Sequence, residues 1–257
     1  MKSKPANNIQ DLQFFGEFGG VNPSISDSST YTFLSANSMS ETFEGNMEGC
    51  YLYSRNSSPS NLYLEEACAA LEGTEAANVF SSGMGAITAT ILQLCKSEDH
   101  IISSRTVYGG TYAFLKNFTP QLKIETTFVD ITSLDDINNS IKPNTKIIYC
   151  EASSNPLLEI ADLEQISKIA KKNNIKLVVD NTFTPLSISP AKYGADVVIH
   201  SLTKFINGTS DTIAGVVCSS KEFILSLRDV NDGAFMLMGT TMDSLRSASV
   251  LKNMRTL

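Results

Sequence analysis

Ser201, Thr203 and Lys204 follow directly after a short apolar run in the second half of the chain. The surrounding stretch reads DVVIHSLTKFINGTSDTIAG, and its Val197–Ile199 segment has the β-branched composition of a buried strand. A lysine held beside low-dielectric protein loses hydration energy unless its amine is paired, neutral or covalently bonded. Lys204 is therefore a candidate for covalent chemistry, with an ordinary surface lysine as the alternative.

Other polar side chains follow the remaining apolar runs. Glu151 comes after KIIYC and is followed by Asn155, Asp180 comes after KLVV, and Tyr108 follows HIISS. Because ligands of open α/β sheets bind outside the carboxyl ends of the strands, we expect these side chains at that edge. Asp180 could pair with a protonated ring nitrogen or anchor a loop. Tyr108 could stack on a flat ring or belong to the core.

A glycine-rich turn, SSGMGA at 81–86, precedes an apolar segment with helical length. Backbone N–H groups at a helix amino terminus suit a phosphate, although a plain tight turn is the alternative. The turn matches neither the P-loop nor the dinucleotide pattern. An aldehyde-binding lysine, an acid for a ring nitrogen, and hydroxyl and backbone donors for a phosphate together match the requirements of pyridoxal phosphate.

Apolar strands alternate with helical segments from residue 60 onwards. Strands are predicted at 100–104, 124–130, 145–152, 176–182, 196–201 and 214–220. Helices are predicted at 61–73, 85–95, 109–120, 162–174 and 240–257, and a short helix begins at 133–136. In the first helix the buried stripe is expected at Leu62, Ala67, Ala70 and Leu71, with Gly73 as the stop. The alternation predicts an α/β fold with a mainly parallel sheet flanked by helices.

The composition argues against several classes of protein. The 257 residues carry a net charge of −7, which disfavours nucleic acid as a partner. No apolar segment follows the first lysines and no run is long enough to span a membrane, so a cytoplasmic enzyme is expected. The five scattered cysteines predict reduced thiols, and the two histidines lack the spacing of metal ligands.

The two ends of the chain differ from its middle. Residues 1–50 lack periodicity yet contain Phe14, Phe15, Phe18, Tyr31 and Phe33, which a disordered tail would not normally hold. We expect an N-terminal arm that contacts a neighbouring subunit, followed by one large domain at 51–257. The last helical pattern reaches Leu257 without a glycine or proline stop signal, so a C-terminal domain is expected to be missing.

Five blocks of sequence resemble the Cys/Met-metabolism pyridoxal-phosphate enzymes, the trans-sulfuration family. They are YLYSRNSSPSNLYLEEACAALEGTEAANVFSSGMGAI, RTVYGGTYAF, YCEASSNPLLEIADL, VVDNTFTPL and DVVIHSLTKFINGTSDTIAG, in the order and spacing of that family. The resemblance covers roughly residues 14–257 and is strongest to the methionine gamma-lyase-like branch. It implies the type I fold of pyridoxal-phosphate-dependent transferases.

The resemblance also implies roles for individual residues. The catalytic group would be Lys204 as the Schiff-base lysine, Asp180 as the partner of the pyridine nitrogen, and Tyr108 as stacking ring and general acid. The other residues expected to bind the cofactor are Gly83, Met84, Ser201 and Thr203 at the phosphate, Asn155 near the phenolic oxygen, and Tyr53 and Arg55 from a neighbouring subunit. The resemblance therefore implies an active site shared between two chains, and also a homotetramer built as a dimer of dimers.

The implied function is β- or γ-elimination of a sulfur amino acid such as methionine or cystathionine by a carbon–sulfur lyase. Gly110 departs from methionine gamma-lyases, which typically have a cysteine there, and Thr209 replaces a histidine or glutamine. No residue matches the arginine that holds the substrate carboxylate. The alternatives are a γ-replacement enzyme (O-acylhomoserine sulfhydrylase or cystathionine gamma-synthase) and a non-catalytic cofactor-binding chain. A nicotinamide-dependent Rossmann enzyme fits poorly, since its glycine fingerprint is missing.

Overall fold

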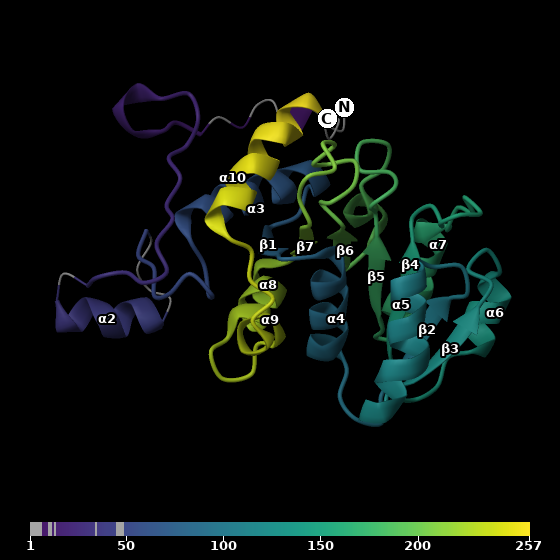
Figure 1. Ribbon diagram of the computed structural model, residues 1–257. Coiled ribbons are helices and arrows are strands. Elements are labelled where there is room, and N and C mark those ends of the chain that lie inside the picture. Colours follow the sequence, from purple (N-terminus) through teal and green to yellow (C-terminus); the bar gives the residue numbers. More distant parts are fainter. Residues whose placement is uncertain (1–6, 10–11, 13, 34, 45–48) are drawn as a thin grey trace.

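One seven-stranded sheet forms the centre of the computed structural model, which describes residues 7–9, 12, 14–33, 35–44 and 49–257. Its strand order is β1-β7-β6-β5-β4-β2-β3 (Figure 1). The strands are β1 (Ala76–Phe80), β2 (His100–Ser104), β3 (Glu125–Val129), β4 (Thr145–Glu151), β5 (Lys176–Asp180), β6 (Val197–His200) and β7 (Gly215–Ser219). β2 to β6 run parallel, whereas β7 is antiparallel to both β1 and β6. The mainly parallel α/β sheet predicted from the sequence is confirmed.

β1 is the strand that the sequence pattern does not reveal. It reads AANVF, in which alanine and asparagine both have low strand propensity. Asn78 is nevertheless fully buried, because its amide donates to the Val79 carbonyl and its carbonyl oxygen accepts from Arg228. Pairing with β7 and the hydrogen bond from Arg228 therefore accommodate this polar residue in the sheet.

Side chains that alternate along each strand enter different cores. In β6, Val197 and Ile199 pack with residues of α4 (Gly83–Leu94), α8 (Lys221–Arg228) and α9 (Ala234–Met238). Val198 points the other way and packs with α3 (Pro59–Glu72) and α10 (Ser244–Asn253). A third core joins β4 and β5 to α6 (Leu134–Asn139) and α7 (Leu163–Lys172). Burial on both faces explains why the strands read as continuous apolar runs.

Helix α3 begins and ends with strong signals in the sequence. The Ser58 side chain accepts from the N–H of Asn61, Pro59 occupies the first turn, and Gly73 ends the helix with φ +73°. The predicted buried stripe is only partly correct, since Leu62 is 37% exposed. Leu64 and Cys68 are buried instead, because α3 presents the face that contacts β1, β7 and α10.

The helix expected at 109–120 is divided into three parts. It begins as α5 (Gly109–Ala113), continues as a π-helical turn, η2 (Phe114–Phe118), and ends as a 3-10 turn, η3 (Thr119–Leu122). Helices α4, α6, α7 and α10 confirm the other predictions with shifted ends. A 3-10 turn, η4 (Pro190–Tyr193), precedes β6, and another, η5 (Met254–Thr256), follows α10. Helices α8 and α9 were not predicted from the pattern.

The described part of residues 1–50 contains a 3-10 turn, η1 (Glu17–Gly19), and a helix, α2 (Ala36–Phe43). Figure 1 shows α2 at the end of an extended segment, away from the helices that cover the sheet. Phe14 packs on the Tyr63 ring, with 5.1 Å between ring centroids, whereas Phe18 and Phe43 are exposed. The predicted arm also includes residues 1–6, 10, 11, 13, 34 and 45–48, which lie outside the described residues.

Candidate active site

The predicted site residues gather where β4, β5 and β6 end and where α4 begins. Glu151 and Asp180 are partners in the β4–β5 register, and Asp180 is paired with Ile199 of β6. The β6 end leads directly into the Lys204 turn. Parallel strands present their carboxyl ends at one edge of the sheet, so distant parts of the sequence meet there.

Asp180 is a buried carboxylate whose backbone and side chain are both fixed. Its Oδ1 accepts from the Thr182 N–H at 2.9 Å and from the Thr182 hydroxyl at 2.6 Å. Burial raises the pKa of Asp180, while the two Thr182 hydrogen bonds and the nearby His200 act in the opposite direction. A buried carboxylate of this kind is suited to pair with a protonated ring nitrogen.

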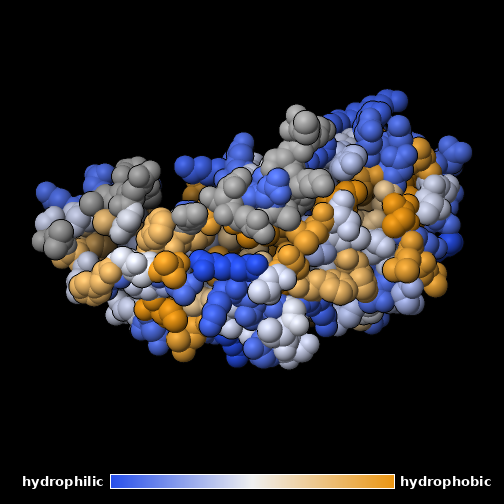
Figure 2. Space-filling view, turned by 90° about the horizontal axis from the view of Figure 1, so that it is seen from above, coloured by the Kyte–Doolittle hydropathy of each residue, from blue (hydrophilic) through white to orange (hydrophobic). Residues whose placement is uncertain are grey.

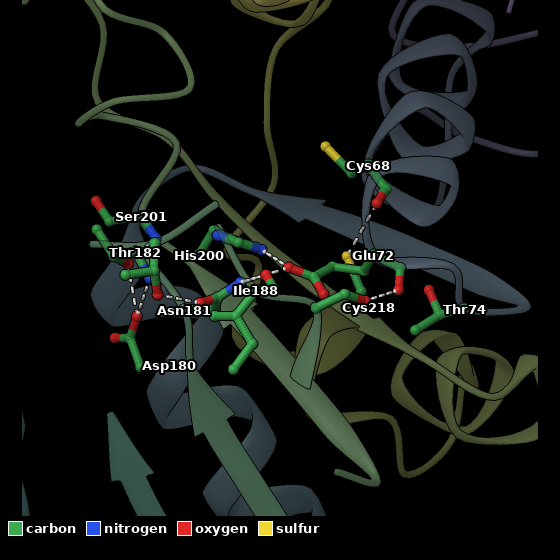
Figure 3. Close-up of polar contacts among 12 residues, drawn as sticks. Cys68, Glu72, Thr74, Asp180, Asn181, Thr182, Ile188, His200, Ser201 and Cys218 are labelled. Atoms are coloured by element: carbon green, nitrogen blue, oxygen red, sulfur yellow. Dashed lines mark hydrogen bonds and ion pairs between the residues drawn. The ribbon is translucent and has the colours of Figure 1, made fainter. Parts of the chain in front are cut away.

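Thr182 connects Asp180 to the Lys204 turn, a role that the sequence alone did not indicate. While its hydroxyl donates to Asp180, its Oγ1 also accepts from the Ser201 N–H at 2.8 Å. Figure 3 shows this chain of three residues at the ends of neighbouring strands. The end of β5 therefore sets the position at which the Lys204 turn begins.

Gly83 lies in close contact with Ser201. A Cβ atom on Gly83 would lie 2.8 Å from Ser201 Cβ and 3.2 Å from Ser201 Cα, so only glycine fits. Ser82 caps α4: its hydroxyl accepts from the Gly85 N–H and its carbonyl from the Ala86 N–H. Within the described chain, no protein acceptor meets the N–H groups of Gly83 and Met84, which are thus available to an anion.

Lys204 and Thr203 lie in the turn after β6, and the structure gives them different surroundings. Lys204 is exposed, and no hydrogen bond or ion pair within the described chain holds its Nζ. The Thr203 hydroxyl donates to the Ala214 carbonyl at 3.1 Å and accepts from the Ala214 N–H at 3.0 Å. Its bonds therefore close the turn onto the start of β7, while the predicted phosphate contact stays untested.

Glu151 brings Tyr108 and Asn155 to the same place. Its Oε1 accepts from the Tyr108 N–H at 2.6 Å, and its Oε2 accepts from the Asn155 N–H at 3.0 Å. Burial, followed by the charge of Asp180, raises the pKa of Glu151 to about 7. The sequence places Glu151 at this edge, but it does not reveal that Glu151 positions two other candidates.

The Tyr108 ring lies next to the start of α4. A Cβ on Gly110 would lie 2.6 Å from Tyr108 Cε1 and 3.1 Å from Met84 Sδ, so the ring and the thioether flank this glycine. Tyr108 is 50% exposed. A half-exposed aromatic side chain beside the first turn of α4 is suited to stack on a flat ring.

Arg55 lies over the Tyr53 ring and is hydrogen-bonded to α9. The Arg55 guanidinium carbon lies 5.6 Å from the centre of the Tyr53 ring. Arg55 also donates to the Met236 carbonyl at 2.9 Å. Among the described residues, neither Tyr53 nor Arg55 has a hydrogen bond or ring contact with Lys204 or Asp180, and their role across a subunit boundary stays a prediction.

Comparison with known proteins identifies the family. Residues 7–257 match the family described as Cys/Met metabolism PLP-dependent enzyme. The chain belongs to this family. Methionine gamma-lyase of Arabidopsis thaliana is 44% identical over 246 residues, which cover 93% of this chain and 56% of that protein.

Two solved structures have the same fold. Cystathionine gamma-lyase from Lactobacillus plantarum, complexed with L-serine, aligns with a TM-score of 0.87 and 28% identity. The alignment covers 99% of this chain and 64% of the Lactobacillus chain. A Campylobacter jejuni protein described as an O-acetylhomoserine (thiol)-lyase aligns with a TM-score of 0.88 and 26% identity, over 99% of this chain and 71% of its own. That protein carries a pyridoxyl-lysine phosphate. The type I fold is thereby confirmed.

The residues of this chain fit pyridoxal phosphate. The N–H groups of Gly83 and Met84, which have no protein acceptor, suit its phosphate. Because Gly83 has no Cβ, Ser201 can lie close to these N–H groups. Buried Asp180 suits its ring nitrogen. Among the described residues, no group of histidine, cysteine or acidic side chains could hold a metal ion, and no helix is long and apolar enough to cross a membrane.

Proposed function

We propose that this chain is the cofactor-binding part of a pyridoxal-phosphate-dependent carbon–sulfur lyase. The reaction would be β- or γ-elimination from a sulfur amino acid such as methionine or cystathionine. The observation that carries the proposal is the meeting of buried Asp180, the first turn of α4 and the Lys204 turn at one edge of the sheet. The names of the relatives support the reaction class, while this chain spans only 56% of the Arabidopsis protein.

Three side chains would carry the chemistry. Bound pyridoxal phosphate withdraws electrons from the α-carbon of an amino acid substrate. Asp180 would keep the pyridine nitrogen protonated, and its burial would exclude competing water. Lys204 would hold the cofactor through its Nζ, and its free amine would take the Cα proton of the substrate. The Tyr108 ring would stack on the cofactor, and its hydroxyl would donate a proton to the departing group.

The remaining residues would hold the phosphate and the phenolic oxygen of the cofactor. The N–H groups of Gly83 and Met84 would bind the phosphate together with the Ser201 hydroxyl. Thr203 contributes by closing the turn through Ala214. Asn155, whose backbone N–H donates to Glu151, would lie near the phenolic oxygen of the cofactor.

The working protein would be a homotetramer of two dimers in the cytoplasm. Apolar side chains of the N-terminal arm are exposed in this single chain, including Phe15 at 66% and Phe18 at 104%. Figure 2 shows apolar side chains reaching the surface at both ends of the molecule. Docking of the arm on a second copy covers such side chains and brings Tyr53 and Arg55 towards the neighbouring phosphate. Five free cysteines suit a reducing compartment.

The cofactor assignment is tested by mixing the purified chain with pyridoxal phosphate and recording its visible absorbance. Borohydride reduction followed by peptide mass spectrometry should then place the pyridoxyl group on Lys204. Lys204→Ala should abolish the visible band, whereas Lys172→Ala, at an exposed lysine of α7, should retain it. A chain that stays colourless with a native circular dichroism spectrum contradicts the proposal.

The reaction is tested on the whole protein by two assays run in parallel. A lyase releases methanethiol from methionine or cleaves cystathionine. The second candidate, a γ-replacement enzyme, joins sulfide or cysteine to O-acetylhomoserine. Its support is the likeness to the Campylobacter structure. Cofactor binding without turnover in either assay supports a non-catalytic cofactor-binding protein.

A further inference from the structure

Glu72, at the last position of α3, has a fully buried carboxylate that meets two loops of the candidate site. Its Oε1 accepts from Asn181 Nδ2 at 2.9 Å and lies 2.6 Å from His200 Nε2 (Figure 3). The side chains of Glu72 and His200 are each 1% exposed. One oxygen atom therefore contacts residues that are more than a hundred positions away in the sequence.

The two partners of Glu72 are the sequence neighbours of the residues that face the cofactor. Asn181 lies between Asp180 and Thr182, and His200 directly precedes Ser201. Successive side chains of an extended segment point to opposite faces of the sheet. Asp180 therefore shares the face of Val178, which packs with α4, whereas His200 shares the face of Val198, which packs with α3. Glu72 thus contacts both segments from the face of the sheet that α3 covers, opposite to the face of Asp180.

Further hydrogen bonds fix this arrangement. Asn181 Nδ2 also donates to the Ile188 carbonyl at 2.9 Å, and its Oδ1 accepts from the Thr184 hydroxyl at 2.6 Å. The Ser189 hydroxyl donates to the Glu72 carbonyl. The loop after β5 is therefore tied to the end of α3 by both the side chain and the backbone of Glu72.

Stability alone does not explain a buried ionisable pair at this place. Removing a carboxylate from water is costly, and a buried ion pair often stabilises a fold no more than apolar side chains of the same volume. Glu72 Oε2 and His200 Nδ1 have no hydrogen-bond partner in the described chain, so the desolvation cost is only partly offset. A directional contact that fixes two loops relative to each other is the more specific account.

We propose that Glu72 is a positioning residue for the cofactor site, acting through Asn181 and His200. Through Asn181 it fixes the Asp180 carboxylate against Thr182, and through His200 it fixes the start of the Lys204 turn. This inference rests on the proposed cofactor site. It adds Glu72 to the residues that determine the geometry of the site, although Glu72 itself would not contact the cofactor.

The same helix offers a matched control. Glu65, two turns earlier on α3, is 4% exposed and forms a buried ion pair with Arg228. Its Oε1 also accepts from the Val79 N–H at 3.2 Å. These contacts lead to β1 and α8 and not to the loops that follow β5 and β6. Loss of Glu65 should therefore destabilise the fold without disturbing the site.

The test compares Glu72→Ala, Glu72→Gln and Glu65→Ala in the same chain as the wild type. Thermal unfolding without cofactor measures the loss of stability, and absorbance titration with pyridoxal phosphate measures its Kd. Visible circular dichroism at saturating cofactor, per mole bound, reports whether the ring is held in one orientation. Saturation removes the effect of weaker binding, so this signal separates positioning from stability.

We expect Glu72→Ala to raise the Kd for pyridoxal phosphate about tenfold and to lose most of the visible dichroism. The expected change in Kd is of the size found when residues that orient metal ligands are replaced. Glu65→Ala should lower the unfolding temperature yet change the Kd by less than about twofold, because it shares no partner with the site. Glu72→Gln retains an oxygen acceptor and should restore most of the dichroism. Equal dichroism in Glu72→Ala and Glu65→Ala would overturn the inference. A wild-type chain that binds no cofactor would instead overturn the proposed function, and this inference with it.

Discussion

The backbone N–H of Tyr108 donates a 2.6 Å hydrogen bond to Glu151 Oε1, which links the end of β4 to the segment after β2. The other oxygen of the same carboxyl group accepts from the Asn155 N–H. One buried side chain thus positions an aromatic ring and an amide that are distant from each other in the sequence. The β4 strand between them supplies the rigid support.

Glu151 should make the stability of the cofactor-free chain fall as the pH rises. Burial raises its pKa from 4.5 to about 7, so the folded chain binds more protons than the unfolded chain between these values. Its stabilising contribution is full below pH 4.5 and is lost as the pH passes about 7. The loss should reach about 3 kcal/mol. Urea unfolding of the wild type and Glu151→Gln across this range measures it, and an identical pH dependence in both chains would contradict it.

His100 should act in the opposite direction. Its ring nitrogens lie 2.8 Å from the Thr145 and Thr127 hydroxyls, and burial, helped by Lys142, lowers its pKa from 6.5 to about 4. The unfolded chain therefore binds more protons between pH 4 and 6.5, and stability falls as the pH drops through this window. We expect His100→Gln to remove about 3 kcal/mol of this acid sensitivity. In the wild type the effects of His100 and Glu151 on the pH dependence of stability oppose each other. Only the single variants separate them.

Gly110 should be required for the position of the Tyr108 ring. A Cβ there would lie 2.6 Å from Tyr108 Cε1, whereas a Cβ on Gly109 meets nothing within 4 Å. Gly110→Ala should therefore lower kcat/KM of the whole protein by about a hundredfold, since small displacements of a catalytic group have effects of this size. Gly109→Ala is the matched control and should retain activity. Equal activity in the two variants would show that the ring is free to move.

Much of this fold follows from local patterns in the sequence. The alternation of apolar strands with helices predicts the parallel sheet, and Ser58, Pro59 and Gly73 mark the ends of α3. The residues after β5 and β6 are correctly expected at one edge because parallel strands share that edge. These features depend on short segments, or on a rule that applies to every such sheet.

Other features depend on contacts that no local pattern contains. The buried Asn78 side chain accepts a hydrogen bond from the distant Arg228, and the Thr203 hydroxyl bonds to Ala214 across the turn. Glu72 reads as one more acidic residue at a helix end, although it is fully buried against His200. Tertiary packing brings these groups together, and for Glu72 it is the packing of α3 on the sheet. Residues that follow the strands of the sheet are thus easier to predict than the residues that hold them in position.

Gly83 should be the most sensitive position of the phosphate site. Ala at this position would place a Cβ 2.8 Å from Ser201 Cβ, and because the Ser201 backbone is 3.2 Å away, the side chain alone cannot relieve the clash. Either α4 or the Lys204 turn must shift, and the N–H donors then no longer converge on one anion. We expect Gly83→Ala to raise the Kd for pyridoxal phosphate at least about tenfold. Gly85→Ala, whose Cβ would lie 3.2 Å from the Ser82 hydroxyl and 3.4 Å from Thr240 Cβ, should raise it much less. Absorbance titration of both variants measures the difference, and tight binding by Gly83→Ala would place the phosphate elsewhere.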